Sequence, residues 1–263
     1  MAKKIPYGLT DYFRIVTEDF YYVDKTKYIE DLEKTAAFLF LIRPRRFGKS
    51  LFLNMLNCYY DVKYADRFEE LFGNQYIGKH PTAEQGKYLV LRFNFSMVRA
   101  TDDKLEAAFN RHISLETAYF ASVYASYFKP DFQEQLKLIP EAAGRLEYIC
   151  LCAKEQGLSI YLLIDEYDNF TNTILSSKGN DVYHSLTHDS GFYRSFFNVV
   201  KGVTTGAEAP VKRMFITGVS PVTLDDVTSG FNIGTNITTD ERFNSMVGFS
   251  ESELHEMLSY YQS

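Results

Sequence analysis

Short apolar runs alternate with longer amphipathic stretches along most of this chain. Short runs rich in β-branched and aromatic residues predict strands, and stretches with an apolar period of 3.6 residues predict helices. We expect strands at Phe38–Ile42, Tyr88–Phe95, Ile160–Ile164 and Lys212–Thr217, and helices at Lys25–Lys34, Ser50–Tyr60, Asp102–Phe128, Glu141–Gln156 and Phe192–Lys201. This alternation predicts an α/β fold with a doubly wound, mainly parallel sheet and helices on both faces.

Two stretches depart from this alternation. The polar stretch Thr171–Ser190 has no clear period, which predicts a loop. Ser250 and Glu253 have the spacing of a capping box, so a helix starts there. Because this helix opens a new apolar face and reaches Ser263 within about three turns, we expect further residues beyond it. We therefore expect a lead-in segment at 1–37, a core at 38–249 and the start of a truncated helical region at 250–263.

Composition narrows the class of protein. The 263 residues can bury a substantial core, and 28 Lys plus Arg against 34 Asp plus Glu give a net charge of −6. No overall basic field therefore favours nucleic acid or an anionic membrane as a partner. Cys58, Cys150 and Cys152 have neither metal-ligand nor Cys-x-x-Cys spacing, which favours a reducing compartment. No stretch approaches the ~18 apolar residues of a membrane span, so we expect a cytoplasmic protein.

The first predicted strand leads into the run Arg43-Pro44-Arg45-Arg46-Phe47-Gly48-Lys49-Ser50. A P-loop has a glycine, four free positions and then Gly-Lys-Ser or Gly-Lys-Thr, and its backbone N–H groups surround phosphates. Arg43 stands where the first glycine belongs, so it must enter the loop in a conformation open to a residue with a Cβ. The alternative is a basic turn between a buried strand and an amphipathic helix.

A second motif decides between these alternatives. The apolar run Ile160–Ile164 ends in Asp165-Glu166, which supplies carboxylates beyond the end of a buried strand. Phosphates need N–H groups and a lysine, and the Mg²⁺ that accompanies them needs a hydroxyl and a carboxylate. The two motifs together favour an ATP site, with the triphosphate held by Arg43, Pro44, Arg45, Arg46, Phe47, Gly48, Lys49, Ser50 and Leu51.

Each candidate residue has an expected role and a simpler alternative. Lys49 would bridge the β and γ phosphates, whereas a solvated lysine at a helix start would oppose the helix dipole. Ser50 would ligate Mg²⁺ together with Asp165, or Ser50 would only cap the helix. Glu166 would act as the general base for the attacking water, or belong to a solvated acidic loop. Asp168 would either tune this acidic pair or serve loop structure.

At these residues the chain resembles the predicted AAA-ATPase-like family of bacterial P-loop ATPases. The matching pieces are Ile5-Pro6-Tyr7-Gly8, Tyr21-Tyr22-Val23-Asp24-Lys25-Thr26, the run from Arg43 to Ser50, Leu163-Ile164-Asp165-Glu166-Tyr167-Asp168 and Ile216-Thr217-Gly218-Val219-Ser220-Pro221. They cover nearly the whole chain, and the arginine at position 43 is typical of that family.

The resemblance implies an AAA/RecA-like P-loop NTPase fold with ATP and Mg²⁺ as cofactors. It also implies that Thr217 and Ser220 sense the γ-phosphate and orient water; the alternative for Ser220, which precedes Pro221, is that it only shapes the turn. Family members commonly carry a C-terminal PD-(D/E)XK nuclease-like domain. We therefore expect an effector domain that is missing from this chain.

Three other residues each have one functional and one structural interpretation. Arg242 would stabilise phosphate charge, in its own chain or in a neighbouring subunit, or be a surface arginine. Tyr22 and Asp24 would flank the adenine, or pack in the core and cap the helix at Lys25–Lys34 respectively.

Two functions compete for this sequence. The first is a Mg²⁺-dependent ATPase, slow in isolation, whose hydrolysis drives or times a conformational change in a C-terminal effector. The alternative is an ATP-binding switch or assembly scaffold with negligible turnover. Both need Lys49 and Ser50, but only the first needs Glu166. Self-association is compatible with either function, and direct binding of nucleic acid is disfavoured by the net acidic charge.

Overall fold

The computed structural model describes residues 2–98, 104–188, 191–221 and 234–262. The chain divides into two compact units. The first, here the terminal unit, comprises Met1–Ala36, Arg43–Lys87 and Asn236–Ser263, and the second, here the sheet unit, comprises Ala37–Ile42 and Tyr88–Thr235. The chain therefore enters the sheet unit early for a single strand and returns to it for the remainder.

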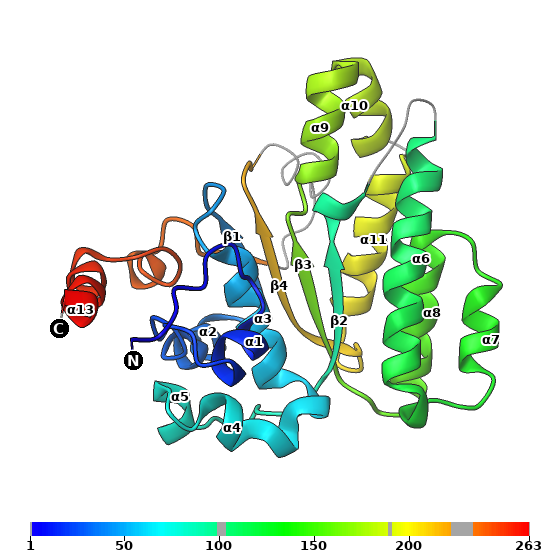
Figure 1. Ribbon diagram of the computed structural model, residues 1–263. Coiled ribbons are helices and arrows are strands. Elements are labelled where there is room, and N and C mark those ends of the chain that lie inside the picture. Colours follow the sequence, from blue (N-terminus) through cyan, green and yellow to red (C-terminus); the bar gives the residue numbers. More distant parts are fainter. Residues whose placement is uncertain (1, 99–103, 189–190, 222–233, 263) are drawn as a thin grey trace. The chain divides into compact units, whose positions relative to one another are not determined.

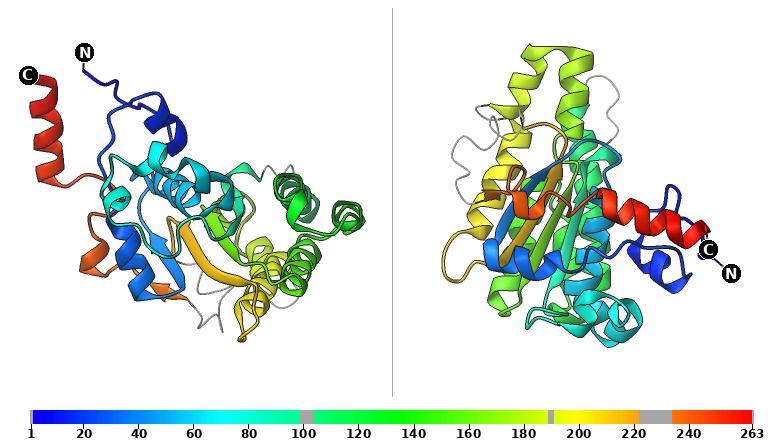
Figure 2. Two further views of the ribbon diagram at one scale, coloured as in Figure 1. Left: turned by 90° about the horizontal axis from the view of Figure 1, so that it is seen from below. Right: turned by 90° about the vertical axis from the view of Figure 1, so that its left-hand side faces the viewer.

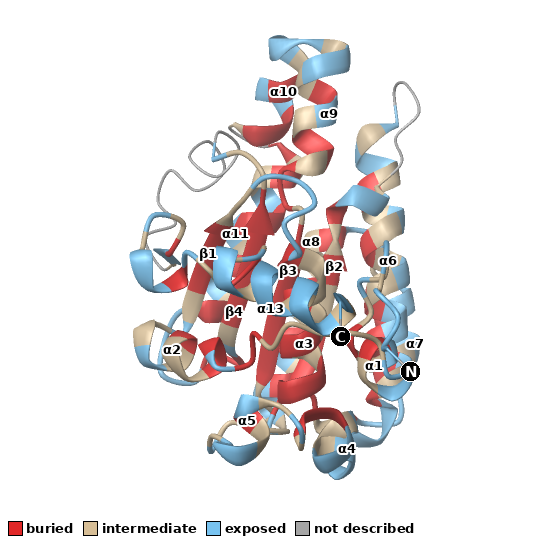
Figure 3. Cartoon of the chain, turned by 60° about the vertical axis from the view of Figure 1, so that its left-hand side comes forward, coloured by how far each residue is buried: buried red, intermediate tan, exposed pale blue. Residues whose placement is uncertain are grey.

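Four apolar runs of the sequence, labelled β1 to β4 in Figure 1, and the short polar strand β5, which was not predicted, form one sheet with the strand order β2-β3-β4-β1-β5. The strands are β1 (Phe38–Ile42), β2 (Leu89–Asn94), β3 (Ile160–Asp165), β4 (Val211–Gly218) and β5 (Thr235–Asn236). The pairs β2 with β3, β3 with β4 and β4 with β1 are parallel. Every residue of β3 is buried, and Figure 3 shows buried residues concentrated in the neighbouring strands as well. The predicted α/β fold with a mainly parallel sheet is confirmed.

The register places the carboxyl ends of three strands at one edge of the sheet. Ile42 at the end of β1 pairs with Gly218 at the end of β4, and Ile164 of β3 pairs with Ile216 of β4. β4 thus lies between the strand that leads into Arg43 and the strand that ends in Asp165. Ligands of open α/β sheets bind outside the carboxyl ends of the strands, so this edge is where a site is expected.

Helices of the sheet unit pack side by side along the sheet (Figures 1 and 2). They are α6 (Leu105–Val123), α8 (Ala142–Glu155) and α11 (Phe192–Thr204), with α7 (Phe132–Lys137) and the short 3₁₀ helices η2 (Phe95–Met97) and η3 (Ala125–Tyr127) beside them. Phe95, Phe109 and Phe196 are fully buried and meet edge to face, with ring centroids 5.4–5.9 Å apart. The expected start of α6 at Asp102 lies outside the described residues.

A helical pair replaces the loop that we predicted for Thr171–Ser190. The structure has α9 (Asn169–Lys178) and α10 (Asn180–Thr187), so the loop prediction is wrong over the described part of that stretch. Each helix buries only a narrow row of side chains, and each row includes a threonine. Because threonine is polar, the helical period of apolar residues is hidden in the sequence. The buried residues are Phe170, Thr171 and Ile174 in α9 and Tyr183, Leu186 and Thr187 in α10.

The terminal unit is helical. Its elements are α1 (Tyr12–Thr17), α2 (Tyr28–Thr35), α3 (Lys49–Tyr60), η1 (Val62–Arg67), α4 (Phe68–Phe72), α5 (Tyr76–Lys79), η4 (Glu241–Phe243) and α13 (Glu251–Gln262). Its core is aromatic, because Tyr12 and Tyr59 both pack on Phe72 with ring centroids 5.2 and 5.4 Å apart. Tyr22 packs edge to face on Tyr12 at 5.2 Å, which agrees with the core-packing alternative for Tyr22.

The expected helix at Lys25–Lys34 begins later than predicted, at Tyr28. Asp24 therefore does not cap it, and the capping role is wrong. The Asp24 carboxylate instead accepts hydrogen bonds from the Thr26 amide at 2.8 Å and hydroxyl at 2.7 Å, and from the Tyr76 amide at 2.6 Å. A short acidic side chain that bonds the backbone two residues on forms an Asx turn, which competes with a helix start.

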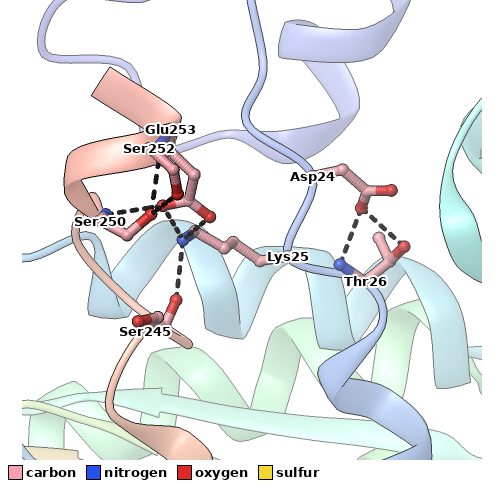
Figure 4. A network of polar contacts seen from close by, with 7 residues as sticks. All are labelled: Asp24, Lys25, Thr26, Ser245, Ser250, Ser252 and Glu253. Atoms are coloured by element: carbon pink, nitrogen blue, oxygen red, sulfur yellow. Dashed lines mark hydrogen bonds and ion pairs between the residues drawn. The ribbon is translucent and has the colours of Figure 1, made fainter. Parts of the chain in front are cut away.

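The predicted capping box at the start of α13 is present (Figure 4). The Ser250 amide donates to Glu253 Oε2 at 2.8 Å, and the Glu253 amide donates to Ser250 Oγ at 3.3 Å. At the other end of α13, the Tyr261 hydroxyl donates to the Lys3 carbonyl at 2.6 Å, and Figure 2 shows the two ends of the described chain close together in both views. No helix in the described ranges is long and apolar enough to cross a membrane.

Candidate functional site

The loop after β1 has its left-handed residues away from Arg43, the position at which a P-loop carries its first glycine. Residues 44–48 are exposed, and the left-handed positions of the loop are Arg46 (φ 66°) and Gly48 (φ 86°). Arg43 has no positive φ, so its Cβ is accommodated without strain, and its guanidinium donates to the Thr238 carbonyl within the terminal unit. The left-handed turn thus falls at Arg46 and not at the position of the missing glycine.

Lys49 and Ser50 begin helix α3. Lys49 is the first residue of the helix and only 4% exposed, and its Nζ donates to the carbonyls of Arg43 and Pro44, both at 2.9 Å. It is therefore not a solvated lysine. Gly48 is the N-cap residue and Ser50 is the second residue of the helix, so Ser50 does not cap it. The backbone N–H groups of a first helical turn have no acceptor within the helix and favour an anion in front of it.

The acidic motif lies at the end of β3 in the sheet unit. Asp165 is fully buried, and its Oδ1 accepts a hydrogen bond of 2.7 Å from the Thr217 hydroxyl. Its Oδ2 is also buried and has no hydrogen-bond partner among the described residues. A buried carboxylate oxygen without a donor is costly unless a cation or proton satisfies it. Asp165 therefore has the chemistry of a ligand for a hard divalent cation such as Mg²⁺.

Glu166, the next residue, has a left-handed backbone with φ 51°. The Asn169 side-chain amide donates to its Oε2 at 3.1 Å. A glutamate rarely adopts this conformation, since its Cβ approaches the following carbonyl oxygen. Glu166 thus stands just beyond the buried strand, with its carboxylate bonded to Asn169.

Thr217 and Ser220 lie at the end of β4, at the same edge of the sheet as Asp165. Thr217 is fully buried, and its hydroxyl is directed to Asp165. Ser220 follows the strand, is half-buried, and its amide donates to Asp168 Oδ2 at 2.6 Å. Asp168 therefore bonds directly to the backbone of this turn.

The structure brings together part of the predicted site and places the rest in a separate unit. Asp165, Glu166, Thr217 and Ser220 share one edge of the sheet unit, whereas Arg43 to Leu51 belong to the terminal unit and follow directly on β1. Arg242 is 60% exposed at its side chain and forms a 2.5 Å ion pair with Asp240, as expected of a surface arginine. In the described ranges no three His, Cys, Asp or Glu side chains cluster as metal ligands.

Sequence reasoning missed two tyrosines near this edge. The Tyr167 hydroxyl donates to the Ser220 carbonyl, and the Tyr193 hydroxyl donates to the Tyr167 carbonyl. Burial raises the pKa of Tyr193 well above its ordinary value, so this hydroxyl remains a donor. Tyr167 follows the acidic pair directly and could have been noticed, but Tyr193 carries no local signal.

A Gly-Lys-Ser loop after one parallel strand and an acidic pair at the end of another are typical of P-loop NTPases. The sequence matches the family described as Predicted AAA-ATPase over residues 6–228, and the chain belongs to this family.

A curated protein of Azotobacter chroococcum mcd 1, described as "Uncharacterized protein in vnfD 5'region", is similar to the chain. The alignment is 26% identical over a length of 260 residues and covers 96% of this chain and 44% of that protein. The chain thus spans less than half the length of this relative. No solved structure matches the chain.

Proposed function

We propose that this protein binds ATP with Mg²⁺ and hydrolyses it. The observation that supports this most directly is the register of the parallel strands. β1, β4 and β3 end at one edge of the sheet. β1 leads into the Lys49 loop, β4 leads into the turn with Ser220, and β3 ends at Asp165, which Glu166 follows. Membership of the predicted AAA-ATPase family agrees with this function.

In this proposal the loop and α3 bind the triphosphate. Lys49 would exchange its two carbonyl acceptors, Arg43 and Pro44, for β- and γ-phosphate oxygens. The first-turn amides of α3, up to Leu51, would donate to the phosphates. The left-handed backbone at Arg46 and Gly48 would shape the loop around them, since αL turns direct successive N–H groups toward one point.

The proposed cation site comprises Ser50 and Asp165. Bound Mg²⁺ would neutralise charge on the phosphate oxygens. Asp165 would offer it the buried oxygen Oδ2, while Thr217 holds the other oxygen and fixes the orientation of the carboxylate. Ser50 lies at the second position of α3, where a P-loop hydroxyl ligates the cation.

Glu166 is the proposed general base. Its carboxylate would accept a proton from the attacking water, and its strained backbone would keep it directed beyond the strand end. Ser220 and Thr217 are proposed to act at the γ-phosphate, Ser220 by orienting water and Thr217 through Asp165. Hydrolysis would then drive or time a conformational change in a C-terminal effector.

The alternative function is an ATP-binding switch with negligible turnover, and one experiment separates the two. Mg²⁺-dependent phosphate release and ATP affinity by calorimetry are measured for wild type, Glu166→Gln and Lys49→Ala. We expect Glu166→Gln to bind ATP normally and to release phosphate about 100-fold more slowly, because an amide cannot accept the proton. We expect Lys49→Ala to lose most of its ATP affinity.

Matched controls are Glu147→Gln in α8 and Lys137→Ala in α7, which make the same changes at exposed positions. Both should behave as wild type. Equal phosphate release by wild type and Glu166→Gln would show that another residue is the general base. A wild-type protein that binds ATP without turnover would favour the ATP-binding switch. Unchanged ATP affinity of Lys49→Ala would remove the P-loop assignment.

A further inference from the structure

The Asp168 carboxylate is buried against the turn that follows β4. Asp168 is 1% exposed. Its oxygens accept hydrogen bonds from the Val219 amide, 3.1 Å to either oxygen, and from the Ser220 amide at 2.6 Å. The Asn172 side-chain amide donates to Oδ2 at 2.8 Å. Such charge-assisted bonds are about twice as strong as neutral ones, so the carboxylate fixes the backbone of the turn.

Tyr167 also joins the segment that follows β3 to the end of β4, through other atoms than those of Asp168. Its amide donates to the Thr217 carbonyl at 3.0 Å, and its hydroxyl donates to the Ser220 carbonyl. Tyr167 is 1% exposed, and its own carbonyl accepts the buried Tyr193 hydroxyl. The segment after Glu166 is therefore bonded to both sides of the turn.

Gly218 shows how closely the two segments approach. A Cβ at this position would lie 2.2 Å from the ring of Tyr167 and 2.8 Å from Asp168 Oδ1. Both distances are below any ordinary contact, so a residue with a side chain would push the segments apart. We call Tyr167, Asp168, Gly218, Val219 and Ser220 the β3–β4 clamp.

We propose that Asp168 is a positioning residue which, through the β3–β4 clamp, holds Ser220 in a fixed place relative to Glu166. Glu166 precedes Tyr167 directly, so any shift of the turn relative to Tyr167 and Asp168 changes the spacing between the base and the Ser220 hydroxyl. This inference rests on the proposed ATPase function, in which these two side chains act on the same water. The β4 turn and the acidic segment then work as one rigid unit.

Asp168→Asn tests this role, because the amide keeps the shape of the carboxylate but replaces one acceptor oxygen by a donor that faces backbone N–H groups. We expect turnover to fall about tenfold, the effect of losing one charged hydrogen bond, with ATP affinity changed by less than about twofold. Asp131→Asn is the matched control, since Asp131 is exposed and forms no capping bond at α7. It should change neither quantity.

The decisive measurement is Asp168→Asn in a Ser220→Ala background. If Asp168 acts by positioning Ser220, its substitution there should lower turnover by less than about twofold, because the group that it positions is already absent. A merely structural role would lower turnover by the same factor in both backgrounds, and that result would overturn the proposal.

Hydrogen exchange gives a readout that does not depend on turnover. In Asp168→Asn the Val219 and Ser220 amides should exchange faster, while the amides of β4 keep their protection. Unchanged exchange at these two amides would also overturn the proposal. A wild-type protein without ATP turnover would refute the proposed function instead, and the exchange experiment would still test the clamp.

Discussion

At the scale of single residues, strain is concentrated beside the proposed chemistry. In the described part of the chain the non-glycine residues with positive φ are Asp19, Arg46 and Glu166, at 55°, 66° and 51°. Two of the three, Arg46 and Glu166, belong to the motifs that carry Lys49 and Asp165. Left-handed backbone costs a residue with a Cβ about 1–2 kcal/mol, and strain retained at such places points to function.

The strain at Glu166 predicts that glycine is more stabilising than alanine at this position, the reverse of their order inside a helix. Glu166→Gly should be more stable than Glu166→Ala by about 1 kcal/mol, because glycine adopts φ 51° without a Cβ clash. At Glu147, exposed within helix α8, the order should reverse, with alanine more stable than glycine by about 1 kcal/mol. Urea unfolding of the four variants measures both differences. Alanine as the more stable residue at both positions would show that Glu166 is not strained.

At the scale of elements, most of the fold could be predicted because strands β1 to β4 and most long helices carry their own pattern, whereas the two polar residues of β5 carry none. Five-residue apolar runs and the box at Ser250 are local signals, and they predicted β1, β3 and α13. The helix that follows Gly48 was predictable for the same reason, although it begins at Lys49, one residue earlier than expected. The α9–α10 pair was missed because its buried stripes are narrow and each includes a polar threonine. The partners of Asp168 were missed because they lie 51 and 52 residues further along the chain.

The turn between α9 and α10 depends on one glycine. Gly179 has φ 85° and ψ −179°, a region that essentially only glycine occupies, and a Cβ there would meet nothing within 4 Å. Gly179→Ala should therefore destabilise the protein by about 1–3 kcal/mol through backbone strain alone. Gly202→Ala, inside α11 and equally free of contacts, should instead stabilise by about 0.5–1 kcal/mol. Thermal unfolding distinguishes these signs, and stabilisation by both substitutions would contradict the turn geometry.

At the scale of the whole molecule, the terminal unit is assembled from three separate stretches of chain. The N-terminal segment, the loop with Lys49 and the C-terminal helix all belong to it. Lys25 joins the first and last of these: its Nζ donates to Glu253 at 2.6 and 2.7 Å and to the Ser245 carbonyl at 2.7 Å (Figure 4). The Lys25 and Glu253 side chains are only 8% and 18% exposed, so solvent screens this pair less than a surface pair.

This ion pair predicts a pH dependence of stability. Burial would raise the pKa of Glu253, but the hydrogen bonds from Lys25 and from the Ser250 amide outweigh burial and lower that pKa below its ordinary value of 4.5. A carboxyl group whose pKa is lowered on folding stabilises the protein above its unfolded pKa, and this contribution is lost as pH falls through the folded value. The contribution of Glu253 should be complete at pH 6–7 and decline below about pH 4.5.

Unfolding free energies of wild type and Glu253→Gln, measured by urea between about pH 7 and 3, test this directly. Near neutral pH we expect the variant to be less stable by about 1–3 kcal/mol, because Lys25 loses a charged acceptor while it remains buried. The difference should shrink as Glu253 of the wild type becomes protonated. Glu155→Gln is the matched control, since the Glu155–Lys129 pair is 50% and 66% exposed and such pairs contribute about 0–1 kcal/mol. A difference for Glu253→Gln that stays constant down to pH 3 would show that the charge of Glu253 does not hold α13 to the N-terminal segment.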